Sequence, residues 1–129
     1  MNYLDTTVIV AALLAAHPAH RRSHAALKGG FSDTHAMAEA FRVLTAAYKI
    51  PASQAADAVL SLPAKFWRAV ELEDYQHAVQ RCADAGVSSG AVYDAVHASV
   101  ARREKAGKIL THNTADFLRF SGSVPVSEP

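Results

Sequence analysis

Short apolar runs alternate with longer helical segments along this chain of 129 residues. Residue periodicity and turn residues predict strands at 2–5, 31–34, 69–72 and 108–111, with a further edge strand at 124–126. Helices are predicted between them, at 9–16, 18–29, 35–48, 53–60, 74–85 and 91–105. Strands that are separated by helices need crossover connections, which favour a parallel sheet. The pattern therefore predicts an α/β fold with helices on both faces of the sheet.

Small polar residues and glycines mark the expected ends of these helices. Gly86 and Gly107 are expected to end the last two helices. The predicted N-caps are all hydroxyl residues: Thr6 or Thr7, Ser53, and Ser88 or Ser89.

The composition predicts one ordinary globular domain. Half of the residues are hydrophobic and 19% are charged, which suffices for a single domain with a core over residues 1–129. The only cysteine, Cys82, excludes an internal disulfide and a cysteine-based zinc site, and core packing is its expected role. The apolar run at 8–16 is short and has no basic residues before it. We therefore expect neither a signal peptide nor a membrane span, and a cytoplasmic location.

An aspartate lies at the centre of the apolar opening run, MNYLDTTVIV. A lone ionised carboxylate in apolar surroundings is strongly disfavoured. Asp5 is therefore expected either at the end of a strand that faces a cleft or beside a cation. In parallel α/β sheets, active sites lie beyond the carboxyl ends of the strands, where the prediction places Asp5.

Three further acids fall at comparable positions in the predicted topology. Glu39 lies early in its helix at the rim of the apolar stripe, and Asp94 lies near the start of a later helix. Asp116 follows the fourth strand across a polar turn. Four clustered carboxylates repel one another, and a hard divalent cation such as Mg²⁺ or Mn²⁺ relieves that repulsion.

Each acid also has an ordinary structural interpretation. Glu39 could pair with Arg42, Asp94 could stabilise its helix start, and Asp116 could be a turn residue. The convergence of all four at one sheet edge favours the functional interpretation. With 13 basic and 12 acidic residues, sequestering four acids would leave a net positive surface suited to a phosphate backbone.

Four segments carry a resemblance to a known family: LDTTVIVAAL, HAMAEAFRVLT, SSGAVYDAVHASVA and ILTHNTADFLRF. In order and spacing they resemble the four sequence blocks of PIN-domain ribonucleases, most closely VapC-type toxins of bacterial toxin–antitoxin pairs. The resemblance covers nearly the whole chain and is weakest between residues 50 and 85. It implies a single PIN domain, a PIN-like three-layer α/β/α sandwich with a central, mainly parallel sheet of four to five strands.

The resemblance assigns roles by position. The four catalytic acids of the family fall on Asp5, Glu39, Asp94 and Asp116. Asp5 and Asp94 would be the primary metal ligands, with Asp116 also a ligand and Glu39 completing the shell. Supporting roles fall on Thr6, Thr7 and Asn113. Ser89, where relatives often have glycine, and His112, in a variable slot, are small departures that remove no carboxylate.

The resemblance also implies an activity and partners. It implies an endoribonuclease that uses Mg²⁺ or Mn²⁺ and leaves 5′-phosphate and 3′-hydroxyl ends. It further implies a homodimer and a cognate VapB-type antitoxin whose tail covers the active site.

Other residues could mimic functional sites. His20 and His24 have the spacing of a zinc pair, but no glutamate intervenes and no third ligand is evident. His35 could bond to Glu39, and His97 could line the cleft or be an ordinary helix histidine. A basic cluster near a helix end is better explained by the helix dipole than by RNA binding: Arg102, Arg103, Lys105 and Lys108.

Two other functional classes remain open from the sequence. A phosphatase of the haloacid dehalogenase type also places an aspartate after its first strand, but Asp5-Thr6-Thr7 lacks the second acid of that motif. A receiver domain is disfavoured as well, because the N-terminus lacks the acidic pair that such a domain needs. The other alternative is a PIN-like module that binds RNA or protein without cutting, although a pure binder would gain affinity for RNA by losing the acids.

Overall fold

A five-stranded sheet forms the centre of the computed structural model, which describes residues 1–129. Its strand order is β3-β2-β1-β4-β5, and every neighbouring pair is parallel. The register pairs Tyr3 of β1 with Phe31 of β2 and with Ile109 of β4, so these strands end at the same edge. The strands are β1 (Asn2–Leu4), β2 (Gly30–Asp33), β3 (Trp67–Arg68), β4 (Ile109–Leu110) and β5 (Val126–Ser127).

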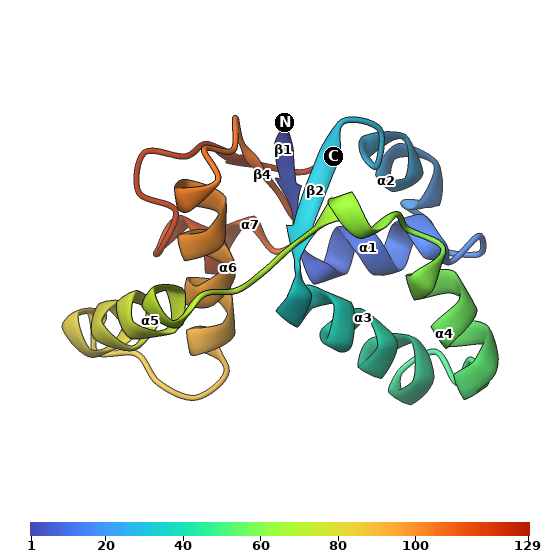
Figure 1. Cartoon of the computed structure of the whole chain (residues 1–129), viewed down its shortest axis with the longest axis horizontal. Helices are drawn as coiled ribbons and strands as arrows, with labels where there is room; N and C mark the ends of the chain where they lie inside the picture. Colours follow the sequence, from blue (N-terminus) through green and yellow to red (C-terminus); the bar gives the residue numbers. More distant parts are fainter.

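Helices cover both faces of this sheet. Figure 1 shows α5 and α6 on one side and α1 to α4 on the other, which confirms the predicted three-layer α/β/α arrangement. None of the helices has both the length and the apolar character needed to span a membrane. The helices are α1 (Thr6–Leu13), α2 (His20–Ala26), α3 (Thr34–Ala46), α4 (Ala52–Leu60), the 3-10 turn η1 (Ala64–Phe66), α5 (Leu72–Ala85), α6 (Ala91–Arg103) and α7 (Thr114–Leu118).

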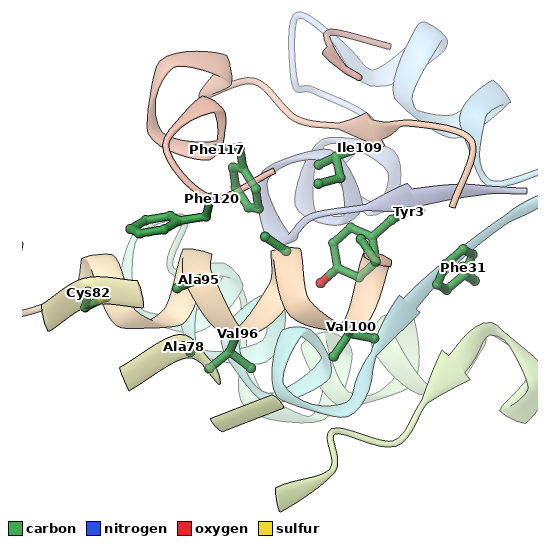
Figure 2. Close-up of a cluster of buried hydrophobic side chains, with 12 residues drawn as sticks. Tyr3, Phe31, Ala78, Cys82, Ala95, Val96, Val100, Ile109, Phe117 and Phe120 are labelled. Atoms are coloured by element: carbon green, nitrogen blue, oxygen red, sulfur yellow. The ribbon is translucent and has the colours of Figure 1, made fainter. Parts of the chain in front are cut away.

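Two buried apolar clusters fill the space between the layers. The cluster drawn in Figure 2 joins Tyr3 and Phe31 of the sheet to α5, α6 and α7, and it includes Phe117 and Cys82. Cys82 is 6% exposed, which confirms its predicted packing role. The other cluster packs Leu4 against α1, α3 and α4. Because both faces of the short central strand β1 are covered, its carboxyl end is held firmly where Asp5 follows.

The predicted strand at 69–72 is wrong. The third strand is Trp67–Arg68, and Leu72 already belongs to α5. A reciprocal capping box fixes this helix start, since the Glu71 backbone N–H donates to Asp74 Oδ2 at 2.9 Å. The capping bonds favour helical backbone over a longer strand. The predicted end of α5 is confirmed, because Gly86 adopts a left-handed conformation with φ 67°.

The predicted hydroxyl N-caps are also wrong. Aspartates at strand ends cap two helices, Asp5 for α1 and Asp33 for α3, where the helix start had been predicted at His35. These carboxylates accept the first free helical N–H groups because the parallel strands deliver them directly to the helix starts. Pro51 precedes α4 and Gly90 precedes α6, neither with a side-chain cap.

The end of α6 differs from the prediction as well. The helix ends at Arg103 rather than at about Lys105, and Lys105, not Gly107, takes the left-handed conformation after it, with φ 56°. Arg103 Nη2 donates to Asp74 Oδ2 at 2.7 Å and to the Ala69 carbonyl at 2.8 Å, and Arg102 donates to the Phe120 carbonyl. Both arginines therefore fasten α6 to neighbouring segments, in agreement with a structural interpretation of the basic cluster.

Candidate active site

Asp5 lies at the carboxyl end of the central strand and is only 4% exposed. Its Oδ1 accepts bonds from Thr7 Oγ1 at 2.6 Å and from the Val8 backbone N–H at 3.2 Å. Its Oδ2 accepts a bond from Thr111 Oγ1 at 2.8 Å. Burial raises the pKa of Asp5 above its ordinary value, although these three bonds oppose the rise. The sequence therefore places a carboxylate in a setting that disfavours its charge.

Glu39 projects from the second turn of α3 and is held by histidine. His97 Nε2 lies 2.5 Å from Glu39 Oε1, and His35 Nε2 lies 3.7 Å from the same oxygen. Thr6 Oγ1 makes a longer bond to Oε1 at 3.4 Å. The Glu39 side chain is 31% exposed, as expected for a residue at the rim of the core. One carboxylate oxygen is thus fixed from inside while the residue reaches solvent.

Asp94 lies in the first turn of α6, and its pKa is raised to about 6. Burial is the main cause, the charge of His97 opposes it, and the negative charges of Asp5, Asp116 and Glu39 raise the pKa further. Asp5, Asp116 and Glu39 therefore all lie within electrostatic reach of Asp94, although they come from distant parts of the chain. Neither Asp94 nor Asp116 forms an ion pair.

The four acids are neighbours without forming a ready-made ligand cluster. No three histidine, cysteine, aspartate or glutamate side chains are close enough together to hold a metal ion in this arrangement. Asp116 is exposed on α7, in the segment that follows β4. The donor set nevertheless fits a hard divalent cation, because it consists of carboxylate oxygens whose mutual repulsion raises the pKa of Asp94.

The structure adds a buried ionic network that sequence reasoning missed. His97, 2% exposed, lies between two carboxylates: its Nδ1 is 2.7 Å from Asp33 Oδ2, and its Nε2 contacts Glu39. Tyr3 donates its hydroxyl to Asp33 Oδ2 at 2.6 Å, and the Ala36 backbone N–H donates to Oδ1 at 2.8 Å. The network ties β1, β2, α3 and α6 together beneath the acids.

The charges in this network sustain one another. Burial alone would lower the pKa of His97, but the charge of Asp33 and the bonds to Asp33 and Glu39 outweigh it and raise the pKa to about 10. Burial alone would raise the pKa of Asp33, but the charge and bond of His97, with the bonds from Tyr3 and Ala36, lower it. At neutral pH, His97 is therefore an imidazolium that donates from both ring nitrogens.

Asp33 carries a sequence signal equivalent to that of Asp5. It stands at the end of the second strand, directly before an amphipathic helix. The predicted strand at 31–34 included Asp33 without assigning it a role. The sequence leaves His97 either to line the cleft or to be an ordinary helix histidine, whereas in the structure it is buried and ion-paired.

The three supporting residues differ in their contacts. Thr7 bonds to Asp5 and Thr6 makes the long bond to Glu39, whereas Asn113 is exposed and uses its backbone N–H to donate to Thr111 Oγ1 at 2.9 Å. Thr111, which the sequence analysis did not single out, is the buried donor to Asp5. The sequence feature that could have pointed to Thr111 is its position at the end of the fourth predicted strand.

The paired histidines of α2 bond to the backbone of α1. His20 Nδ1 lies 3.0 Å from the Ala11 carbonyl oxygen, and His24 Nδ1 lies 3.3 Å from the Ala12 carbonyl oxygen. These bonds hold α2 against α1.

Comparisons with known proteins agree with this geometry. The family model for the PIN domain matches residues 3–122, a range that includes all four acids. Among solved structures, the crystal structure of Mycobacterium tuberculosis VapC20, a sarcin-ricin loop cleaving toxin, is similar over 100% of both chains, with a TM-score of 0.78 and 15% sequence identity. This likeness concerns the fold. No curated protein matches the sequence.

Proposed function

The chain belongs to the PIN-domain family, and from this membership and the four neighbouring acids we propose that it is a metal-dependent endoribonuclease of the VapC toxin type. One observation carries the proposal: burial, and after it the negative charges of Asp5, Asp116 and Glu39, raise the pKa of Asp94 to about 6. Repulsion among clustered carboxylates destabilises the folded state, which favours the interpretation that these acids bind a common ligand. The similarity to VapC20 supports the toxin type through the shared fold.

The residues that would hold the metal are Asp5, Asp94 and Asp116, with Glu39 completing the shell. When bound, Mg²⁺ or Mn²⁺ would offset the clustered negative charge and polarise a phosphodiester group. Thr7 and Thr111 fix both oxygens of Asp5, so this carboxylate is oriented before any ligand arrives.

Glu39 is suited to handle a proton. His97 holds Oε1 through a charge-assisted bond, which fixes the carboxylate and leaves Oε2 to orient a water molecule or accept its proton. Thr6 contacts Glu39, and both Thr6 and Asn113 would orient water or phosphate. Hydrolysis of RNA in this arrangement needs no covalent intermediate on the protein.

The proposed partners follow from the same site. The substrate is RNA, and the inhibitor is a cognate VapB-type antitoxin. An anionic cleft of four carboxylates is a good receptor for an arginine, which can bind a carboxylate through two parallel hydrogen bonds. We further propose a homodimer, a cytoplasmic location and a single domain over residues 1–129.

Purified protein incubated with structured RNA tests the proposal. We expect cleavage with Mg²⁺ or Mn²⁺, none with EDTA, and none for Asp94→Asn in either condition. Asp84→Asn, which removes an exposed acid of α5 that bonds only to Gln80, is the matched control and should cleave normally.

Other outcomes separate the alternatives. Release of phosphate from a small phosphate monoester, without RNA cleavage, would identify a phosphatase. Tight RNA binding without cleavage under any metal condition would identify a non-catalytic module.

A further inference from the structure

A hollow of about 230 Å³ lies beside Asp5, because Thr7 in its lining donates a hydrogen bond to that carboxylate. Thr6 and Thr7, the two residues that follow Asp5, form part of its wall. Val10 of α1 and Val43 of α3 form an apolar part of its lining. The hollow therefore shares a wall with the site of the proposed chemistry but contains none of the four acids.

Three aromatic rings line the rest of the hollow, each from a different part of the chain: His17, Tyr48 and His112. The rings of His17 and His112 are nearly parallel, at 26°, with centroids 6.1 Å apart. Those of His17 and Tyr48 are tilted at 54° with centroids 6.3 Å apart. Tyr48 is 43% exposed, so its ring is accessible. Flat aromatic ligands stack favourably on such rings.

Hydrogen bonds fix the polar edges of two of these rings. The Ala19 backbone N–H donates to His17 Nδ1 at 3.0 Å, so the proton of a neutral His17 ring is on Nε2, where it can be donated to a ligand. His112 Nε2 lies 3.1 Å from Ser23 Oγ, which leaves His112 Nδ1 for a ligand. The lining thus offers neutral donors and acceptors around an apolar floor.

The charge of the hollow restricts what it can bind. No lysine, arginine, aspartate or glutamate lines it. Burial and the nearby Arg22 lower the pKa of His112, which keeps that ring neutral at physiological pH. A phosphate group would find no permanent cation here, whereas an uncharged heteroaromatic ring would find both stacking surfaces and hydrogen-bonding edges.

A short hydrogen-bond chain links the hollow to the nearest acid. The His112 backbone N–H donates to Thr7 Oγ1 at 3.0 Å, and Thr7 Oγ1 donates to Asp5 Oδ1 at 2.6 Å. A group seated against His112 is therefore two hydrogen bonds away from Asp5. In an RNA strand, that places an unpaired base close to the phosphate at the acids.

We propose that this hollow binds one unpaired nucleobase of the substrate RNA, next to the bond that is cut. The inference rests on the proposed ribonuclease function and adds a base-binding subsite made by His17, Tyr48 and His112. Sequence-specific recognition of RNA commonly uses splayed bases stacked on aromatic side chains, including histidine.

Equilibrium binding to short single-stranded RNA tests the subsite. The probes are fluorescein-labelled oligo(A), oligo(C), oligo(U) and an abasic oligoribonucleotide of equal length, measured by anisotropy with Mg²⁺ on the Asp94→Asn protein to prevent cleavage. Adding Tyr48→Ala should weaken binding of at least one base-containing probe by roughly 5- to 150-fold, the range for one stacked base. The same change should leave binding of the abasic probe within twofold, on the order of experimental scatter.

Two further variants keep the test independent of folding defects. Tyr75→Ala removes a tyrosine of matched exposure, 42%, from α5 and should change no binding constant. His17→Phe keeps the ring and removes its hydrogen-bonding edge, so it should retain stacking and alter the preference among bases. Thermal melts of each variant confirm that it is folded.

The outcomes separate this inference from the proposed function. Equal losses for base-containing and abasic probes, or equal behaviour of Tyr48→Ala and Tyr75→Ala, would overturn the base subsite even if the wild-type protein cleaves RNA. If Tyr48→Ala instead weakens only the binding of an inhibitory protein partner, the hollow is a protein-docking pocket and the inference is wrong. A base-dependent loss without RNA cleavage by the wild type would support the subsite and refute the nuclease.

Discussion

Replacing His97 by leucine should destabilise the protein strongly. The change leaves Asp33 buried and charged, with only the Tyr3 hydroxyl and the Ala36 N–H to compensate it. Removing one partner of a buried ion pair costs about 3–5 kcal/mol. That is a large part of the roughly 5–15 kcal/mol by which a domain of this size is stable.

The pKa of His97 leads to a similar magnitude. A rise from 6.5 to about 10 corresponds to roughly 5 kcal/mol of stabilisation of the charged ring. Because the pKa is raised in the folded state, this stabilisation is fully present below pH 6.5 and is lost as the pH rises toward about 10. The pKa of Asp33 is lowered by the same interaction with His97, so the stabilisation from Asp33 is lost as the pH falls through the folded-state pKa of Asp33. Because both pKa shifts arise from one ion pair, their free energies are not added.

Urea unfolding of wild type and His97→Leu between about pH 6.5 and pH 9 measures both quantities. The difference in unfolding free energy should be largest at the low end and shrink by roughly 1.4 kcal/mol for each pH unit. The pKa of Tyr3 is raised above 10, so the tyrosine does not titrate in this range.

The double variant His97→Leu, Asp33→Asn is the matched control. Without the buried charge on residue 33, it should recover part of the loss seen in the single variant. A difference between wild type and His97→Leu that is independent of pH, or smaller than about 1 kcal/mol, would refute the reasoning that His97 is a charged partner of Asp33.

Three further predictions concern the acids and the partners. Asp94→Asn should abolish cleavage. The raised pKa of Asp94 means that its negative charge destabilises the fold at any pH above its ordinary pKa of 3.8, so the variant should also raise the unfolding free energy near pH 7 by about 1–2 kcal/mol after solvent screening. Retained cleavage or a lower melting temperature would contradict this. The cognate antitoxin should inhibit the enzyme by placing an arginine among the four acids. Reversing the charge of that arginine should restore nuclease activity to the complex. An inhibited complex whose acids still bind Mg²⁺ would exclude this mode of inhibition. Light scattering at micromolar concentration should give the mass of a dimer, and a monomeric mass would refute the homodimer.

The alternation of strands and helices was readable from the sequence because it depends on local patterns. Apolar periodicity and glycine at residue 86 placed α3 and the end of α5 within a few residues. The predicted strand at 69–72 was wrong because the capping box of Glu71 and Asp74 starts a helix there. These capping bonds outweigh the strand preference of the apolar pair Ala69-Val70, which precedes Glu71. A run of two to four residues carries too little periodicity to settle such a competition.

The caps failed for a related reason. Hydroxyl residues and aspartate have similar preferences for the N-cap position, so the choice between Asp5 and Thr6 depends on where the strand delivers the chain. In the folded protein, β1 ends at Leu4 and the Asp5 carboxylate is directed at the Val8 N–H.

The sequence by itself determined the order of the elements, the parallel sheet and, through that topology, the edge at which Asp5, Glu39, Asp94 and Asp116 meet. Only the tertiary structure decided which partners hold these acids. The contacts of His97 with Asp33 and Glu39 join residues 64 and 58 positions apart, and Thr111 reaches Asp5 across 106 positions. The physical reason is that parallel crossovers bring residues that are far apart in sequence to one edge of the sheet. The partner of a buried charge there depends on how the elements pack, and local sequence patterns do not predict it.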